Sequence, residues 1–126
     1  MTCLLDTHFL IWITTASQRL SHFQWLERYE PWGVSPVSLL EIQLLSEVGR
    51  VRLDNLGFAR TVMNDPRFVI DEVPITTLIE RALGLTWTRD PFDRLIAAHS
   101  QARRAPLCSV DSVMLRHHKP IVPELR

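Results

Sequence analysis

TCLLDTHFLIWI, residues 2–13, joins a short apolar run to a helix-compatible run through a single aspartate. Residues 2–5 predict a buried β-strand that ends at Asp6, and residues 7–15 predict a helix. A short apolar strand that leads directly into a helix is the repeating unit of α/β proteins, in which helices cover a sheet of parallel strands. This opening stretch therefore predicts an α/β fold.

The same alternation continues along the rest of the chain. Apolar runs and turn signals predict strands at 34–35, 68–73 and 107–110, and a short fifth strand at 120–122. Pro31-Trp32-Gly33 predicts a break in the chain just before the strand at 34–35. Helical spacing of apolar residues predicts helices at 21–28, 36–48, 56–64, 75–85 and 91–103, with a helical turn at 111–117. We therefore expect an α/β/α sandwich with a central, mostly parallel sheet of four or five strands.

Length and composition limit the classes of protein to consider. The chain has 126 residues, of which 46% are hydrophobic and 22% charged, which is typical of a folded protein with one core. We expect a single domain over residues 1–126. The 14 basic residues equal the 14 acidic ones, which excludes a simple cationic nucleic-acid binder but not a nuclease with local charge.

The two cysteines, Cys3 and Cys108, each lie in a short apolar run, where a free thiol behaves as a small hydrophobic group. Asp6 interrupts the N-terminal apolar run, which also lacks the basic segment of a secretion signal. No apolar stretch approaches the roughly 20 residues that span a bilayer. We expect no membrane association and a cytoplasmic location.

Acidic residues recur where the predicted strands lead into helices. Asp6 ends the first strand and Asp111 the fourth, Glu41 lies early in the helix after the second, and Asp90 and Asp93 flank the start of the helix at Pro91. Ligands of parallel α/β sheets bind beyond the carboxyl ends of the strands. These carboxylates are therefore candidates for a shared site.

Each acid also has an ordinary structural interpretation. Asp6, Asp90 and Asp111 are suitable helix N-caps, and the helix dipole favours Asp93 in a first turn. Ser38 and Glu41 have the spacing of a capping box. Taken together, however, acids that converge on one pocket repel one another unless a cation is bound. Carboxylate ligands without a thiolate suit Mg²⁺ or Mn²⁺, one or two ions, and such ions promote in-line attack on phosphodiesters.

The sequence resembles the PIN-domain ribonucleases, and specifically the VapC-type toxins of type II toxin–antitoxin pairs. The resemblance covers nearly the whole chain, and its most specific motif is Asp90-Pro91-Phe92-Asp93-Arg94-Leu95. The other matching stretches, in the family's order, are residues 4–8, 35–42, 73–83 and 109–111.

The resemblance implies that Asp6, Glu41, Asp93 and Asp111 hold the catalytic metal. Ser109 stands where the family often has Thr or Ser near the metal or the scissile phosphate. Asp90 is a weaker candidate for supporting the metal ligands, and Arg94 is a weaker candidate for binding phosphate. Two departures concern substrate or partner contacts: Thr88 stands where the family often has His, and residues 112–115 lack an aromatic side chain.

The activity implied is Mg²⁺- or Mn²⁺-dependent hydrolysis of RNA phosphodiester bonds, with 5′-phosphate and 3′-hydroxyl products. The resemblance also implies a small cognate antitoxin protein that occludes the acidic groove, and a homodimer built through early helices. The tryptophans are expected in the core or interfaces. For Arg50, Arg52 and Arg89, surface charge is the ordinary interpretation and RNA contact the alternative.

Other functions fit less well. A HAD-like phosphatase needs a second aspartate two residues after Asp6, where the chain has His8. A receiver domain gives Glu41 no role. A catalytically inactive PIN-like module that binds RNA or protein remains the main alternative, against which the intact acids argue.

Overall fold

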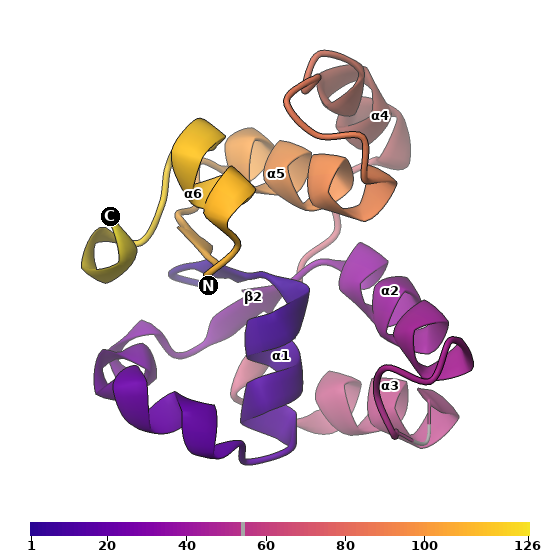
Figure 1. Cartoon of the computed structure of the whole chain (residues 1–126), viewed down its shortest axis with the longest axis vertical. Coiled ribbons are helices and arrows are strands. Elements are labelled where there is room, and N and C mark those ends of the chain that lie inside the picture. Colours follow the sequence, from indigo (N-terminus) through magenta and orange to yellow (C-terminus); the bar gives the residue numbers. More distant parts are fainter. Residues whose placement is uncertain (54) are drawn as a thin grey trace.

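The computed structural model describes residues 1–53 and 55–126 and contains a four-stranded parallel sheet (Figure 1). Its strands lie in the order β3-β2-β1-β4, and Leu4 is the register partner of both Gly33 and Leu107. The mixed α/β fold with a central parallel sheet is confirmed. The strands are β1 (Leu4–Leu5), β2 (Trp32–Val34), β3 (Phe68–Ile70) and β4 (Leu107–Cys108).

Helices cover both faces of the sheet. In Figure 1, α1, α3 and the 3₁₀ segments of residues 18–29 lie on one side of the sheet, and α5 and α6 lie on the other. The α-helices are α1 (Thr7–Thr14), α2 (Pro36–Glu47), α3 (Asn55–Asn64), α4 (Ile75–Leu83), α5 (Pro91–Arg103) and α6 (Ser112–His117); the 3₁₀ helices are η1 (Gln18–His22), η2 (Gln24–Tyr29) and η3 (Pro123–Leu125).

The strand order creates a point where the chain changes direction across the sheet. From β1 the chain steps outward to β2 and β3, then returns past β1 to add β4 on its other side. Neighbouring loops diverge at such a switch point, which opens a crevice beyond the carboxyl ends of the two strands. Here the crevice lies beyond β1 and β4, the strands that lead to Asp6 and Asp111.

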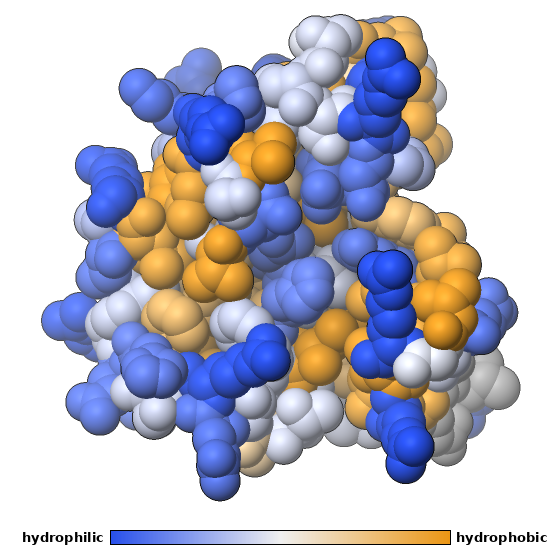
Figure 2. All heavy atoms as spheres, in the orientation of Figure 1, coloured by the Kyte–Doolittle hydropathy of each residue, from blue (hydrophilic) through white to orange (hydrophobic). Residues whose placement is uncertain are grey.

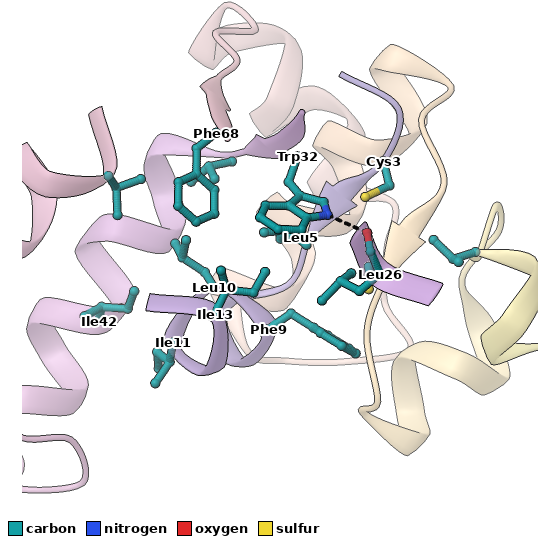
Figure 3. Packing of buried hydrophobic residues seen from close by; sticks show 14 of the residues in the cluster. Cys3, Leu5, Phe9, Leu10, Ile11, Ile13, Leu26, Trp32, Ile42 and Phe68 are labelled. Atoms are coloured by element: carbon teal, nitrogen blue, oxygen red, sulfur yellow. Dashed lines mark hydrogen bonds between the residues drawn. The ribbon is translucent and has the colours of Figure 1, made fainter. Parts of the chain in front are cut away.

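Alternation of side chains along the short strands builds a core on each face. Leu5 and Cys108 belong to the larger cluster, whereas their neighbours Leu4 and Leu107 belong to the cluster beneath α5 and α6, as the period of two in a β-strand requires. Figure 3 shows the larger cluster, where Trp32 Nε1 donates a 2.9 Å hydrogen bond to the Leu26 carbonyl. Both cysteines are buried and free.

The prediction of an α-helix at 21–28 is wrong, because the segment forms η1 and η2. Four side chains spaced by three residues pack on the core, those of Leu20, Phe23, Leu26 and Tyr29, and Trp25 packs there as well. A 3₁₀ helix has three residues per turn, so this spacing places all four on one side.

The predicted break at residues 31–33 is also wrong, because Trp32 and Gly33 belong to β2. Gly33 packs closely against β1, since a Cβ atom there would lie 2.8 Å from the Cys3 carbonyl oxygen. The predicted strand at 120–122 is reduced to a single parallel bridge between Ile121 and Leu107. Within residues 1–53 and 55–126, no helix combines the length and apolarity needed to cross a membrane.

Candidate active site

A cavity of about 810 Å³ opens at the carboxyl ends of the strands, between α1, α2 and the start of α5. Figure 2 shows this face, with hydrophilic side chains near its centre and hydrophobic ones gathered over α2. The cavity is lined by five carboxylates together with apolar and basic residues. The carboxylates are those of Asp6, Glu41, Asp90, Asp93 and Asp111.

Asp6 is the most deeply buried of these acids, with 5% of its surface exposed. Its Oδ1 accepts a 2.7 Å hydrogen bond from the Thr7 amide and so caps α1, while its Oδ2 accepts a 2.6 Å hydrogen bond from Ser109 Oγ. Burial raises the pKa of Asp6, and the charge of Asp111 raises it further, although the two hydrogen bonds act in the opposite direction. The carboxylate is therefore fixed in place by both oxygens.

Ser109 links Asp6 to Asp111. It is fully buried at the end of β4, and its Oγ accepts a 3.1 Å hydrogen bond from the Asp111 amide while donating to Asp6. Asp111 in turn caps α6, since its Oδ1 accepts a 2.9 Å hydrogen bond from the Met114 amide. One hydroxyl thus couples the ends of the two strands that flank the switch point.

Glu41 reaches the cavity from α2. The helix begins at Pro36 and is capped by Ser35, whose Oγ accepts a hydrogen bond from the Val37 amide. The alternative interpretation of Ser38 and Glu41 as a capping box is therefore wrong, because Ser38 already lies within the first turn. Glu41 Oε1 instead accepts a 2.5 Å hydrogen bond from Thr7 Oγ1.

Thr7 and Ser38 hold Glu41 in this orientation. Both residues are fully buried, and their hydroxyl oxygens lie 3.2 Å apart. A hydroxyl carries one hydrogen, so Thr7, which donates to Glu41, accepts from Ser38. Burial raises the pKa of Glu41, and Asp6 and Asp90 raise it further against the opposing Thr7 hydrogen bond.

Asp90 and Asp93 enter the cavity from the start of α5. Asp90 Oδ1 caps the helix by accepting hydrogen bonds from the amides of Phe92 (2.8 Å) and Asp93 (3.2 Å). Burial raises the pKa of Asp93 to about 7, with added contributions from Asp90, Asp6, Asp111 and Glu41. Asp93 therefore experiences the combined negative charge of all four other acids.

The donor set fits a hard divalent cation. One carboxylate oxygen each from Glu41, Asp90 and Asp93 lies within 4.8 Å of the others. Oxygen ligands at this spacing match the preference of Mg²⁺ and Mn²⁺. Burial raises the pKa values of Asp6, Glu41 and Asp93, and the charges of neighbouring acids raise them further. A bound cation would relieve the repulsion between these acids.

The predicted site residues do not all lie in the cavity. Asp6, Glu41, Asp93 and Asp111 line it, and Asp90, the weaker candidate, belongs to the closest carboxylate group. Arg94 points elsewhere: its Nε donates a 2.7 Å hydrogen bond to the Thr88 carbonyl. It lines a separate small pocket between α4 and α5, because the early part of α5 packs against α4 on that side.

Sequence reasoning missed Thr7 and Ser38. Thr7 directly follows the strand-end aspartate, and Ser38 lies three residues before Glu41, so both stood beside predicted ligands. The sequence suggested a capping role for Ser38 and no role for Thr7. Only the packing of α1 against α2 shows that their hydroxyls meet.

Comparisons with known proteins agree with this fold. The PIN domain family model matches residues 3–119. The structure is similar to a toxin–antitoxin complex from Klebsiella pneumoniae, with a TM-score of 0.68, 21% sequence identity and 95% of each chain covered, which shows a shared fold. No curated protein matches the sequence. Since the family model spans nearly the whole chain, the chain belongs to the PIN domain family.

Proposed function

We propose that this PIN-domain protein is a divalent-metal-dependent endoribonuclease and the toxin of a toxin–antitoxin pair. The observation that carries the proposal is the convergence of five carboxylates on one cavity at the switch point of the sheet. PIN domains are generally nucleases, and the chain shares its fold with a protein from a toxin–antitoxin complex.

Asp6, Glu41, Asp93 and Asp111 are the proposed ligands of one or two Mg²⁺ or Mn²⁺ ions, with Asp90 beside Glu41 and Asp93. A bound ion would lower the pKa of a water molecule and neutralise charge on the scissile phosphate.

Hydrogen bonds within the protein fix the orientation of the carboxylates before substrate binds. Ser109 and the Thr7 amide fix both oxygens of Asp6. Thr7 Oγ1 donates a hydrogen bond to Glu41 Oε1, which leaves Glu41 Oε2 to bind an ion or to orient a bound water. The pKa of Asp93 is raised to about 7. Binding of a cation would lower this pKa, so that Asp93 loses its proton as it becomes a ligand.

The proposed protein partner is a small antitoxin that covers the cavity. Leu44 and Val48 line the cavity and are 43% and 60% exposed, and exposed apolar groups of this kind mark surfaces that bind proteins. A homodimer is proposed as well. Growth arrest on expression, relieved by co-expression of a small gene next to this one, is the expected cellular result.

The nuclease activity is tested with purified protein and single-stranded RNA. Cleavage should require Mg²⁺ or Mn²⁺, stop with EDTA, and fall about a hundredfold in Asp6→Asn and Asp93→Asn. Asp65→Asn is the matched control, because Asp65 pairs with Arg67 outside the cavity. Equal cleavage by all of these proteins would identify a contaminating nuclease and contradict the proposal.

A further inference from the structure

The cavity extends well beyond the space that a metal ion requires. Its acids lie at one end, whereas Trp12, Leu44, Leu45 and Val48 line its walls along α1 and α2. Two arginines, Arg19 and Arg50, also line it. The metal chemistry described above uses none of these residues.

Arg19 is held in a defined position. After α1 the backbone reverses at Ala16, where φ is 49°, and the Ser17 amide donates a 2.9 Å hydrogen bond to the Trp12 carbonyl. Ser17 Oγ then accepts a hydrogen bond from the Arg19 amide. This turn brings the Arg19 guanidinium over the Trp12 ring, with its central carbon 5.5 Å from the ring centroid. Phe23, stacked against Trp12 with the ring planes 9° apart, supports the indole.

Neither cavity arginine is neutralised within the protein. Among residues 1–53 and 55–126, the arginines in ion pairs are Arg28, Arg67 and Arg103, and neither Arg19 nor Arg50 has a carboxylate partner. Both are exposed. The cavity therefore carries uncompensated negative charge at the strand ends and uncompensated positive charge at Arg19 and Arg50.

We propose that Arg19 and Arg50 bind backbone phosphates of the RNA that neighbour the scissile one. The inference rests on the proposed ribonuclease function. A guanidinium presents a planar pair of donors that matches a phosphate. Trp12 lies six residues beyond Asp6, about 9 Å along α1 at 1.5 Å per residue. An RNA strand whose scissile phosphate lies at the acids therefore reaches the arginines within the same cavity.

Charge complementarity favours RNA over a protein segment in this part of the cavity. The five carboxylates repel a polyanion, so a nuclease that uses them needs fixed positive charge nearby to hold the strand. The apolar wall between the two ends would then face ribose and base surfaces. Arg19 and Arg50 are positioning residues in this account, since they contact phosphates that do not react.

The test measures binding of a fluorescein-labelled single-stranded RNA of mixed sequence at several KCl concentrations with Mg²⁺ present. All proteins carry Asp93→Asn, so that the RNA remains intact. Arg19→Gln, and separately Arg50→Gln, should weaken binding about tenfold at low salt. Each should also reduce the slope of log affinity against log salt by about 0.7, the value for one lost phosphate contact on a single strand.

Arg67→Gln is the matched control. Arg67 also lies over an indole, that of Trp32 at 5.9 Å, but it pairs with Asp65 and lies outside the cavity. The control should keep the affinity and salt slope of the parent. Equal binding by Arg19→Gln, Arg50→Gln and Arg67→Gln would overturn the inference, whatever the cleavage assay shows. If the binding difference appears but wild-type protein does not cleave RNA, the phosphate site stands and the nuclease proposal fails.

Discussion

Ser109 Oγ donates a 2.6 Å hydrogen bond to Asp6 Oδ2, joining two residues that lie 103 positions apart in the sequence. The bond connects the end of β4 to the end of β1, and both residues are buried. Because Asp6 Oδ1 is held by the Thr7 amide, Ser109 determines how the second oxygen of this acid faces the cavity.

Replacing Ser109 with alanine should lower kcat/KM for RNA and the affinity for Mn²⁺ about tenfold, because groups that orient metal ligands typically contribute 10- to 100-fold. The pKa of Asp6, already raised by burial, should rise further without this donor. Kinetic assays and calorimetric Mn²⁺ titration check the prediction. Ser112→Ala is the control, since Ser112 is exposed at the start of α6. Wild-type metal affinity in Ser109→Ala would contradict this role.

Thr7→Val removes the donor to Glu41 with little change in side-chain volume. The variant should bind Mn²⁺ about tenfold more weakly and lose about 1 kcal/mol of unfolding free energy, the typical net contribution of a hydrogen bond. Thr14→Val, on the same helix, removes a hydroxyl that donates to the Leu10 carbonyl outside the cavity. If both variants lose stability and neither loses metal affinity, Thr7 serves the helix alone.

Asp93 should make the metal-free protein less stable as pH rises. Its folded pKa is raised to about 7, whereas an unfolded aspartate titrates near 3.9. The folded state therefore holds more protons between about pH 4 and pH 7, and stability falls across that window. With EDTA at pH 8, Asp93→Asn should exceed wild type by about 2 kcal/mol after allowance for solvent screening. Urea unfolding at pH 4 and pH 8 measures this, and a difference independent of pH would refute it.

His118 should have the opposite effect on stability. It is buried, and burial lowers its pKa to about 4. Its Nε2 lies 2.8 Å from Ser100 Oγ and donates to it, because Ser100 gives its one hydrogen to the Ala105 carbonyl. An unfolded histidine gains its proton near pH 6.5, so the stability contributed by neutral His118 is present above that pH and is lost as pH falls toward 4. His118→Gln should flatten this loss in urea unfolding, whereas His117→Gln, at an exposed neighbour, should leave it unchanged. Equal slopes in both variants would contradict the assignment.

Much of the fold follows from local signals. Pro36 and Pro91 begin α2 and α5 as predicted, and Gly49 follows α2 with the positive φ of 78° that glycine adopts readily. The errors arose where tertiary packing overrides local preference. Trp32 and Gly33 suggested a turn, yet they form a strand because Trp32 fills the core and Gly33 lets β2 approach β1.

Part of the candidate site could also be predicted from the sequence. Asp6 and Asp111 stand at strand ends, so sheet topology alone brings them together. Helix capping and a place in the cavity seemed to be alternatives for these acids, but each of the two both caps a helix and lines the cavity. The direction of Arg94 could not be predicted, because it depends on how α4 packs against α5.

The central claim is that the carboxylates around Asp6 bind a divalent cation, and anomalous diffraction at the manganese edge tests it most directly. Crystals grown with Mn²⁺ should show an anomalous peak about 2.1 Å from carboxylate oxygens of the cavity. The peak should be absent from Asp93→Asn crystals grown in the same way. Crystals of the wild-type protein with saturating Mn²⁺ and no anomalous peak among Asp6, Glu41, Asp90, Asp93 and Asp111 would contradict the account.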